Sequence, residues 1–285
     1  MVRGGLPDEG PVRLGQVALP AGKLIAGHGD HVAWATLESV PGSGRVWAAL
    51  SELHPQTGLV PVLLGSDLDV GAEFPSDARG LPDDVMRRWD TREFGGPEDP
   101  RGADGVDVAA LLANRWRDWV SWQEGDAEAV EWRLPFTLEW PGLAPRQDAP
   151  LTAAERDHGL DVVLPRIRAA SREAPEARVG LVAAGRAADL LAVIGWDGLT
   201  NWDFSVLTLT AVLRSWEDRF GARLIDVGSA DLRLFVERPP RTLEAAQRLA
   251  AEQVVLADDC IDGAREIPNL APRLVNAPIW TFWWD

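Results

Sequence analysis

Apolar positions recur with regular periods through residues 176–285. Within residues 206–220 they are spaced by three and four, which predicts an amphipathic helix that is capped by Ser205 and ends at Gly221. Strand-like and further helical runs alternate along the rest of this part. The strand-like runs cover residues 177–184, 222–228, 232–237 and 279–285, and the helical runs cover 185–195, 242–257 and 267–275. This order predicts an α+β fold, a ferredoxin-like split βαβ sandwich with extra helices.

The pattern is less regular in the first half of the chain. Residues 31–64 have the pattern of a strand, a short helix and a second strand, and an amphipathic helix is predicted from Val106 to about Val120. Residues 66–105 are rich in glycine, proline and aspartate, which is typical of long surface loops. We therefore expect an α+β N-terminal lobe, a linking helix and a C-terminal domain, at residues 1–150, 151–175 and 176–285.

The closing segment, IWTFWWD, contains three of the 14 tryptophans of the chain. As a strand, it places Trp280, Phe282 and Trp284 on one face and Trp283 on the other. We expect the first face to cover helices of the C-terminal domain. The tryptophan on the opposite face predicts that something packs there too, most simply the N-terminal half.

The chain is strongly acidic. Its 285 residues have a formal net charge of -16 at pH 7, and residues 66–131 contain 17 acidic and 7 basic residues. Such a charge repels the phosphates of nucleic acids and the anionic surface of a membrane, so neither is expected as a partner. It attracts basic proteins, and we expect the partner to be one of them. With 46% hydrophobic and 25% charged residues, the composition is otherwise that of a globular protein.

Cysteine and histidine are scarce, with one and four residues. Cys260 therefore has no intramolecular disulfide partner, and no closed transition-metal site is expected. The N-terminal residues lack the apolar core of a secretory signal. The longest apolar region, residues 179–196, is interrupted by Arg186 and Asp189 and is too short to cross a membrane. We expect a cytoplasmic protein without a cofactor or a metal.

Several motifs in the C-terminal part carry a resemblance to a known family. They are GWDGLTN, LRSWEDRFGARL, VERPPRTLEAAQRLAAEQ, LADDCIDG and the closing WTFWWD. On these motifs the chain resembles the bacterial family called domain of unknown function 4253. The stretch GRVWAALSELHPQTGLVPVLL is similar to the amino-terminal part of its longer members. Members often have cysteines where this chain has Trp202 and Ala257, so a metal or redox role of those cysteines does not carry over. The resemblance implies no activity.

Seven residues of these motifs are candidates for binding, at motif positions or in a cleft: Trp196, Asn201, Trp216, Glu217, Glu252, Gln253 and Asp259. Glu252 and Gln253 fall on helix stripes that are otherwise largely apolar, and a buried polar side chain needs a hydrogen-bond partner. Asn201 is one candidate for that partner. These residues form either an internal structural contact, which the pattern favours, or part of a carboxylate site.

No motif names a reaction, and no catalytic residue is assigned. Asp258, Asp259 and Asp262 are close enough in sequence to bind a hard cation, although an acidic loop at the end of a helix explains them as well. We expect a non-enzymatic protein-binding module for a basic partner, of which an immunity protein against a bacterial toxin is one form. The alternative is a hydrolase or transferase with a carboxylate site in the cleft between the two lobes.

Overall fold

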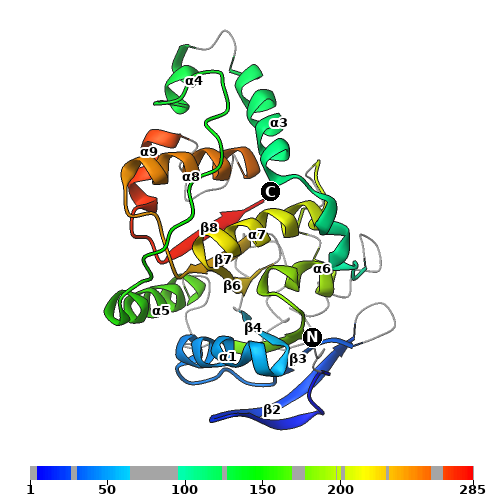
Figure 1. Cartoon of the computed structure of the whole chain (residues 1–285). Coiled ribbons are helices and arrows are strands. Elements are labelled where there is room, and N and C mark those ends of the chain that lie inside the picture. Colours follow the sequence, from blue (N-terminus) through cyan, green and yellow to red (C-terminus); the bar gives the residue numbers. More distant parts are fainter. Residues whose placement is uncertain are drawn as a thin grey trace, which may run out of the picture.

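The structure of the protein, a computed structural model, describes residues 5–26, 31–64, 96–123, 127–168, 177–196, 198–199, 203–228, 231–257 and 266–284. Its strands are β1 (Gly10–Leu14), β2 (Val17–Ala26), β3 (His31–Thr36), β4 (Leu59–Leu64), β5 (Arg178–Ala183), β6 (Ala222–Val227), β7 (Asp231–Val236) and β8 (Ile279–Trp283). Within the described ranges they form one eight-stranded sheet in the order β1-β2-β3-β5-β4-β6-β7-β8 (Figure 1). Neighbouring strands are antiparallel except β4 and β6, which are parallel.

The α+β class is confirmed, but the strand order differs from the predicted split βαβ order. Strand β5 pairs with β3 and β4, and β4 then pairs with β6 through Leu63 and Asp226. β5 and β6 therefore run in opposite directions and are separated by a strand from residues 1–150. Strand β4 is buried along its whole length, as is usual for a strand in the middle of a sheet whose two faces are covered. The division at residues 1–150, 151–175 and 176–285 stays a prediction, and the sheet is shared by its first and last parts.

Helices cover both faces of the sheet. They are α1 (Ser43–Thr57), η1 (Pro100–Gly105), α3 (Val108–Ser121), α4 (Ala127–Trp132), α5 (Ala153–Arg168), η2 (Ala187–Asp189), α6 (Leu190–Ile194), α7 (Val206–Phe220), α8 (Leu243–Leu256) and α9 (Ile267–Leu274). In β4, Val60 and Val62 belong to the apolar cluster that contains side chains of α3 and α6 to α9. Leu59 and Leu63 belong to a second cluster with side chains of α1 and α5. The two clusters follow from the alternation of side chains along a strand, and they make a three-layer arrangement.

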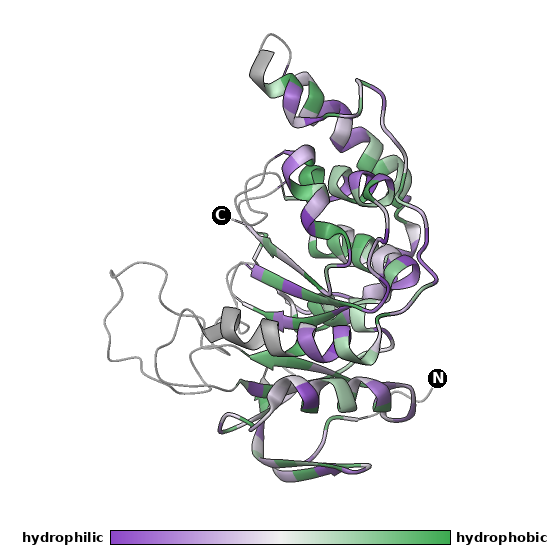
Figure 2. Cartoon of the chain, turned by 90° about the vertical axis from the view of Figure 1, so that its left-hand side faces the viewer, coloured by the Kyte–Doolittle hydropathy of each residue, from purple (hydrophilic) through white to green (hydrophobic). Residues whose placement is uncertain are grey.

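The helices are amphipathic, as one-sided burial requires. Figure 2 shows hydrophilic and hydrophobic residues on the same helices, with hydrophobic residues along the strands between them. Helix α7 has the predicted limits: the Ser205 side chain accepts a hydrogen bond from the Thr208 N–H at 3.2 Å, and Gly221 ends the helix with a φ of 62°. None of the helices in the described residues is both long and apolar enough to cross a lipid bilayer.

Strand β8 is fully buried on one face and partly buried on the other. Trp280, Phe282 and Trp284 are buried, and the Phe282 ring stacks on Trp216 with centroids 5.2 Å apart. On the opposite face, Ile279 packs against the second cluster, but Trp283 remains 42% exposed. The second cluster contains Leu19, Trp47 and Leu59, so side chains of the N-terminal half pack on this face at Ile279, while Trp283 at the end of the strand stays partly exposed.

Candidate functional site

Glu252 lies at the centre of a buried polar contact between α7, α8 and the segment around Ala144. Its side chain is 0% exposed. Oε1 accepts from the Ala144 N–H at 2.7 Å and from Arg219 Nη1 at 2.7 Å. Oε2 accepts from Trp216 Nε1 at 2.8 Å and from Arg219 Nη2 at 2.6 Å. Arg219 Nη1 also donates to the Ala144 carbonyl at 2.9 Å, so the backbone N–H and the carbonyl of Ala144 are both hydrogen-bonded.

This arrangement supports the structural interpretation of Glu252. A carboxylate accepts about four hydrogen bonds, and the four donors named above fill that capacity. A bidentate arginine also neutralises its charge. Such a carboxylate has neither a free lone pair for a substrate proton nor contact with solvent, so general acid–base chemistry is not what the geometry favours.

The other predicted binding residues are not gathered around Glu252. Trp196 is buried elsewhere, donates from Nε1 to the Gly228 carbonyl at 2.8 Å and contacts Trp284 edge to face. Glu217 accepts from Arg186 Nε at 2.9 Å. Gln253 is 1% exposed, and its Nε2 has no hydrogen-bond partner among the described residues. Asn201 and Asp259 lie outside the described residues. Of the seven candidates, the structure therefore brings Trp216 and Glu252 into direct contact.

Metal-binding geometry is not found in the part of the chain that the structure describes. There, no group of three or more histidine, cysteine, aspartate or glutamate side chains could hold a metal ion. Asp258, Asp259 and Asp262 fall outside these residues. The expected absence of metal and cofactor stays a prediction.

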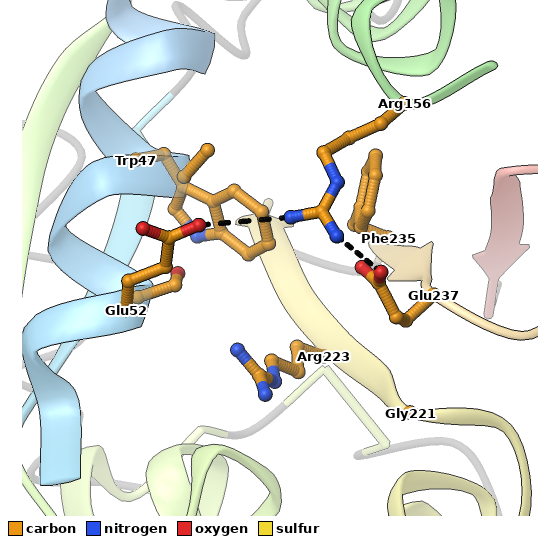
Figure 3. Close-up of a pocket in the computed structure, with 9 residues that line it drawn as sticks. Trp47, Glu52, Arg156, Gly221, Arg223, Phe235 and Glu237 are labelled. Atoms are coloured by element: carbon orange, nitrogen blue, oxygen red, sulfur yellow. Dashed lines mark hydrogen bonds and ion pairs between the residues drawn. The ribbon is translucent and has the colours of Figure 1, made fainter. Parts of the chain in front are cut away.

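A small pocket lies between α1, α5 and the strands β6 and β7 (Figure 3). Its volume is about 30 Å³, and its lining includes Trp47, Glu52, Arg156, Arg223, Phe235 and Glu237. Buried Trp47 and Phe235 form its apolar wall, with ring centroids 5.6 Å apart. Arg156 forms an ion pair with Glu237 and lies 3.7 Å from Glu52. The pocket therefore combines a buried aromatic wall with four charged side chains.

Helix α5, which carries Arg156, is anchored by the neighbouring Glu155. Glu155 accepts from the Thr152 N–H at 2.7 Å, and the Glu155 N–H donates to Thr152 Oγ1 at 3.3 Å, which is a capping box. Arg241 Nη1 donates to Glu155 Oε1 at 2.9 Å. The hydrogen bond from Arg241, followed by those from Thr152, lowers the pKa of Glu155 to about 2. The charged form of Glu155 therefore holds the start of α5 beside the pocket.

A pH dependence of stability follows from this lowered pKa. Because the pKa is below its ordinary value of 4.5, the contribution of Glu155 is complete above about pH 5.5 and is lost as the pH falls toward 2. Glu155→Gln is expected to reduce the fall in urea midpoint between about pH 6 and pH 3. Glu98→Gln, at an exposed acid, is the control and should leave that fall unchanged. An identical pH profile for Glu155→Gln and the parent protein would contradict the anchoring role.

Residues 108–140 form a helical arm, with α3 packed on the body and α4 at its far end (Figure 1). Trp116 fixes the arm from inside: its Nε1 donates to the Leu138 carbonyl at 3.0 Å, and its ring contacts Trp119, Phe136 and Trp140. Arg115 joins the arm to the body through the Val255 carbonyl at 2.7 Å and Asp203 at 2.9 Å. The hydrogen bond from Arg115 lowers the pKa of Asp203. The arm is thus a positioned element of the fold.

The outer part of the arm exposes large apolar side chains. Trp122, immediately after α3, is 84% exposed, and Leu138 is 59% exposed. Val130 and Leu134 are exposed as well. These four residues, named here the tip cluster, account for more than half of the large apolar side chains that are exposed in the described residues, the others being Leu37, Leu243 and Trp283. The four residues share one segment of the chain, and exposed apolar side chains that form one patch are typical of an interaction surface.

The same part of the arm is acidic. Residues 118–140 contain six acidic residues and one arginine. The exposed Asp118, Glu131 and Glu139 form no ion pair with any residue that the structure describes. Arg133 donates instead to Gln123 at 3.2 Å. The segment that carries the tip cluster therefore also carries acidic side chains, three of which form no ion pair within the described residues.

Comparison with known proteins concerns the C-terminal part. The match begins at the first residue of β5 and runs to the end of the chain. Residues 178–285 match the family described as Domain of unknown function (DUF4253). The DUF4253 match contains Trp216, Arg219 and Glu252, but neither the helical arm nor the α1 and α5 walls of the pocket. No curated protein and no solved structure matches the chain.

Sequence reasoning did not single out Trp122 or Arg223. The helical period of residues 106–120 identifies the buried face of α3, and Trp122 follows that stretch. The sequence did contain an indication of the arm, because five of the 14 tryptophans fall within residues 116–140, a segment that is also rich in acidic residues. No signal of this kind marks Arg223, since its surroundings come from α1, α5 and β7.

Proposed function

We propose that the chain is a non-enzymatic protein-binding module that docks a basic partner through the helical arm. The observation that carries this proposal is Trp122, which is 84% exposed on an acidic element that Arg115 joins to the body of the protein. Tryptophan is the residue type most often found among binding hot spots. An immunity protein that neutralises a basic toxin is one form of this function.

The two features of the arm have separate physical roles in this proposal. Burying the tip cluster against a partner removes apolar surface from water, which supplies affinity. The surrounding carboxylates raise the rate of encounter with a basic surface and disfavour acidic proteins. Trp122 and Val130 of the tip cluster belong to the acidic stretch at residues 66–131, and in this proposal charge and apolar contact act on the same partner.

The binding proposal is favoured over a carboxylate enzyme for reasons of geometry. Glu252, the most buried candidate acid, is saturated by Arg219, Trp216 and Ala144. The pocket in Figure 3, at about 30 Å³, is much smaller than the roughly 300 to 1,000 Å³ of ordinary small-molecule sites.

The proposal predicts a large effect of one substitution on the arm. A partner is first isolated with the intact chain as bait and purified, and its affinity is then measured by calorimetry. Trp122→Ala is expected to weaken the complex about 30-fold or more, because a hot-spot truncation costs about 2 kcal/mol or more. Trp283→Ala is the matched control, since Trp283 is an exposed tryptophan on the sheet rather than on the arm.

The charge component is tested in the same complex. Glu131→Gln combined with Glu139→Gln should lower the association rate, whereas Trp122→Ala should mainly raise the dissociation rate. Equal affinity of Trp122→Ala and the parent chain, or a partner that is itself acidic, would rule out docking through the arm.

A further inference from the structure

Arg223 lies at the mouth of the pocket, and its guanidinium has no partner among the residues that the structure describes. It extends from β6 beside Phe235, with which it is in register, and its side chain is exposed. Its side chain makes no hydrogen bond and no ion pair with any described residue. The other guanidinium of the pocket, on Arg156, is already engaged by Glu237 (Figure 3). Arg223 is therefore available to an anion from outside the chain.

The surroundings of Arg223 strengthen an interaction with a small anion. The wall made by Trp47 and Phe235 is buried, and the Trp47 indole is fixed by its hydrogen bond to the Pro61 carbonyl at 3.0 Å. A low-dielectric wall increases the attraction between opposite charges beside it. The nearly buried Ser51 also lines the pocket, and its hydroxyl makes no hydrogen bond with a described residue. The Arg223 guanidinium and the Ser51 hydroxyl are therefore two hydrogen-bond donors that line the same small pocket.

Charge and size indicate which anion fits. Arg156 and Arg223 are balanced by Glu52 and Glu237, so the pocket has no net charge and disfavours a dianion such as phosphate. A carboxylate can take two parallel hydrogen bonds from one guanidinium, as a phosphate can, so charge rather than hydrogen-bond geometry favours the carboxylate here. Because the pocket is small, at about 30 Å³, the remainder of the carrier would lie at its open mouth.

We propose that this pocket binds a carboxylate group, which pairs with Arg223 and lies against the wall of Trp47 and Phe235. The carboxylate belongs either to a small carboxylic acid or to the carboxyl end of a peptide, and in both cases the same protein groups bind it. The site is separate from the helical arm and does not depend on the proposed docking function.

The test is a titration of the full chain, followed through its arginine Nε–H NMR signals. The probes are propionate, a short peptide with a free carboxyl end, the same peptide amidated, and inorganic phosphate. Propionate or the free peptide should shift the Arg223 signal saturably below about 50 mM, the amidated peptide should not, and phosphate should bind more weakly. If the free peptide binds more tightly than propionate, the ligand is the carboxyl end of a peptide. If propionate binds more tightly, the ligand is a small carboxylic acid.

Substitutions connect the binding to the pocket. Arg223→Gln should weaken the binding at least tenfold, whereas Glu52→Gln, which removes a repelling charge, should strengthen it a few-fold. Arg117→Gln is the matched control at an exposed arginine of α3. Because Arg223 is exposed, its variant should melt like the parent chain, and this is measured alongside. No saturable shift with either carboxylate, equal binding of phosphate, or unchanged affinity of Arg223→Gln would overturn the proposal.

Discussion

Glu252→Gln is expected to lower the free energy of unfolding by about 3 to 5 kcal/mol. The substitution removes the negative charge that accepts two hydrogen bonds from the Arg219 guanidinium, at 2.7 and 2.6 Å, in a buried position. The guanidinium then stays largely buried without its counter-charge, and a donor of the new amide faces the N–H of Ala144 or of Trp216. Urea unfolding followed by fluorescence measures the change.

A control on the same helix separates this effect from a general loss of charge. Glu244→Gln removes an exposed carboxylate that lies 3.7 Å from Arg248, and exposed pairs of this kind contribute about 0 to 1 kcal/mol. If Glu252→Gln is as stable as Glu244→Gln, the buried contact is not a structural centre. The carboxylate-site interpretation would then regain support.

Trp280→Ala is expected to destabilise the protein by a similar amount, about 3 to 5 kcal/mol, which is typical of truncating a buried tryptophan. Trp280 is 2% exposed and contacts both Trp216 and Phe220 edge to face, at 5.7 and 5.3 Å between centroids. Its removal leaves a cavity between β8 and α7. Thermal and urea unfolding both report the loss.

Trp283→Ala is the matched control, because it makes the same substitution on the opposite face of the same strand. Trp283 is 42% exposed, so its variant should lose much less stability than Trp280→Ala. Equal losses for the two variants would mean that the strand does not have the two-faced burial described here. Deletion of residues 280–285 should remove the stability of the C-terminal part altogether.

The parts of the fold that depend on local sequence could be predicted. Helix α7 begins and ends where Ser205 and Gly221 place it, because capping acts within a few residues. The position of β4 between β5 and β6 could not be predicted. Its six apolar residues indicate a buried strand, but nothing local states which strands lie at its two edges. Pairing between distant segments depends on the packing of the whole chain.

The same distinction applies to the sites. The helix pattern around Glu252 predicted a buried polar residue that needs a partner, and that partner proved to be Arg219 with Trp216, three residues apart on α7. Asn201, the partner considered from the sequence, lies outside the described residues. The pocket around Arg223 is lined by four elements that come together only in the folded chain, so no sequence pattern predicts it.

The most direct measurement of the docking proposal is site-specific photo-crosslinking. A benzophenone side chain replaces Trp122 in one variant of the full chain and Trp283 in another, and both are irradiated with the purified partner at low salt and at about 1 M salt. The docking account predicts a crosslink from position 122 to a basic protein, a clearly lower yield at high salt, and little or none from position 283. Equal yields from the two positions, or a yield from position 122 that salt leaves unchanged, would contradict it.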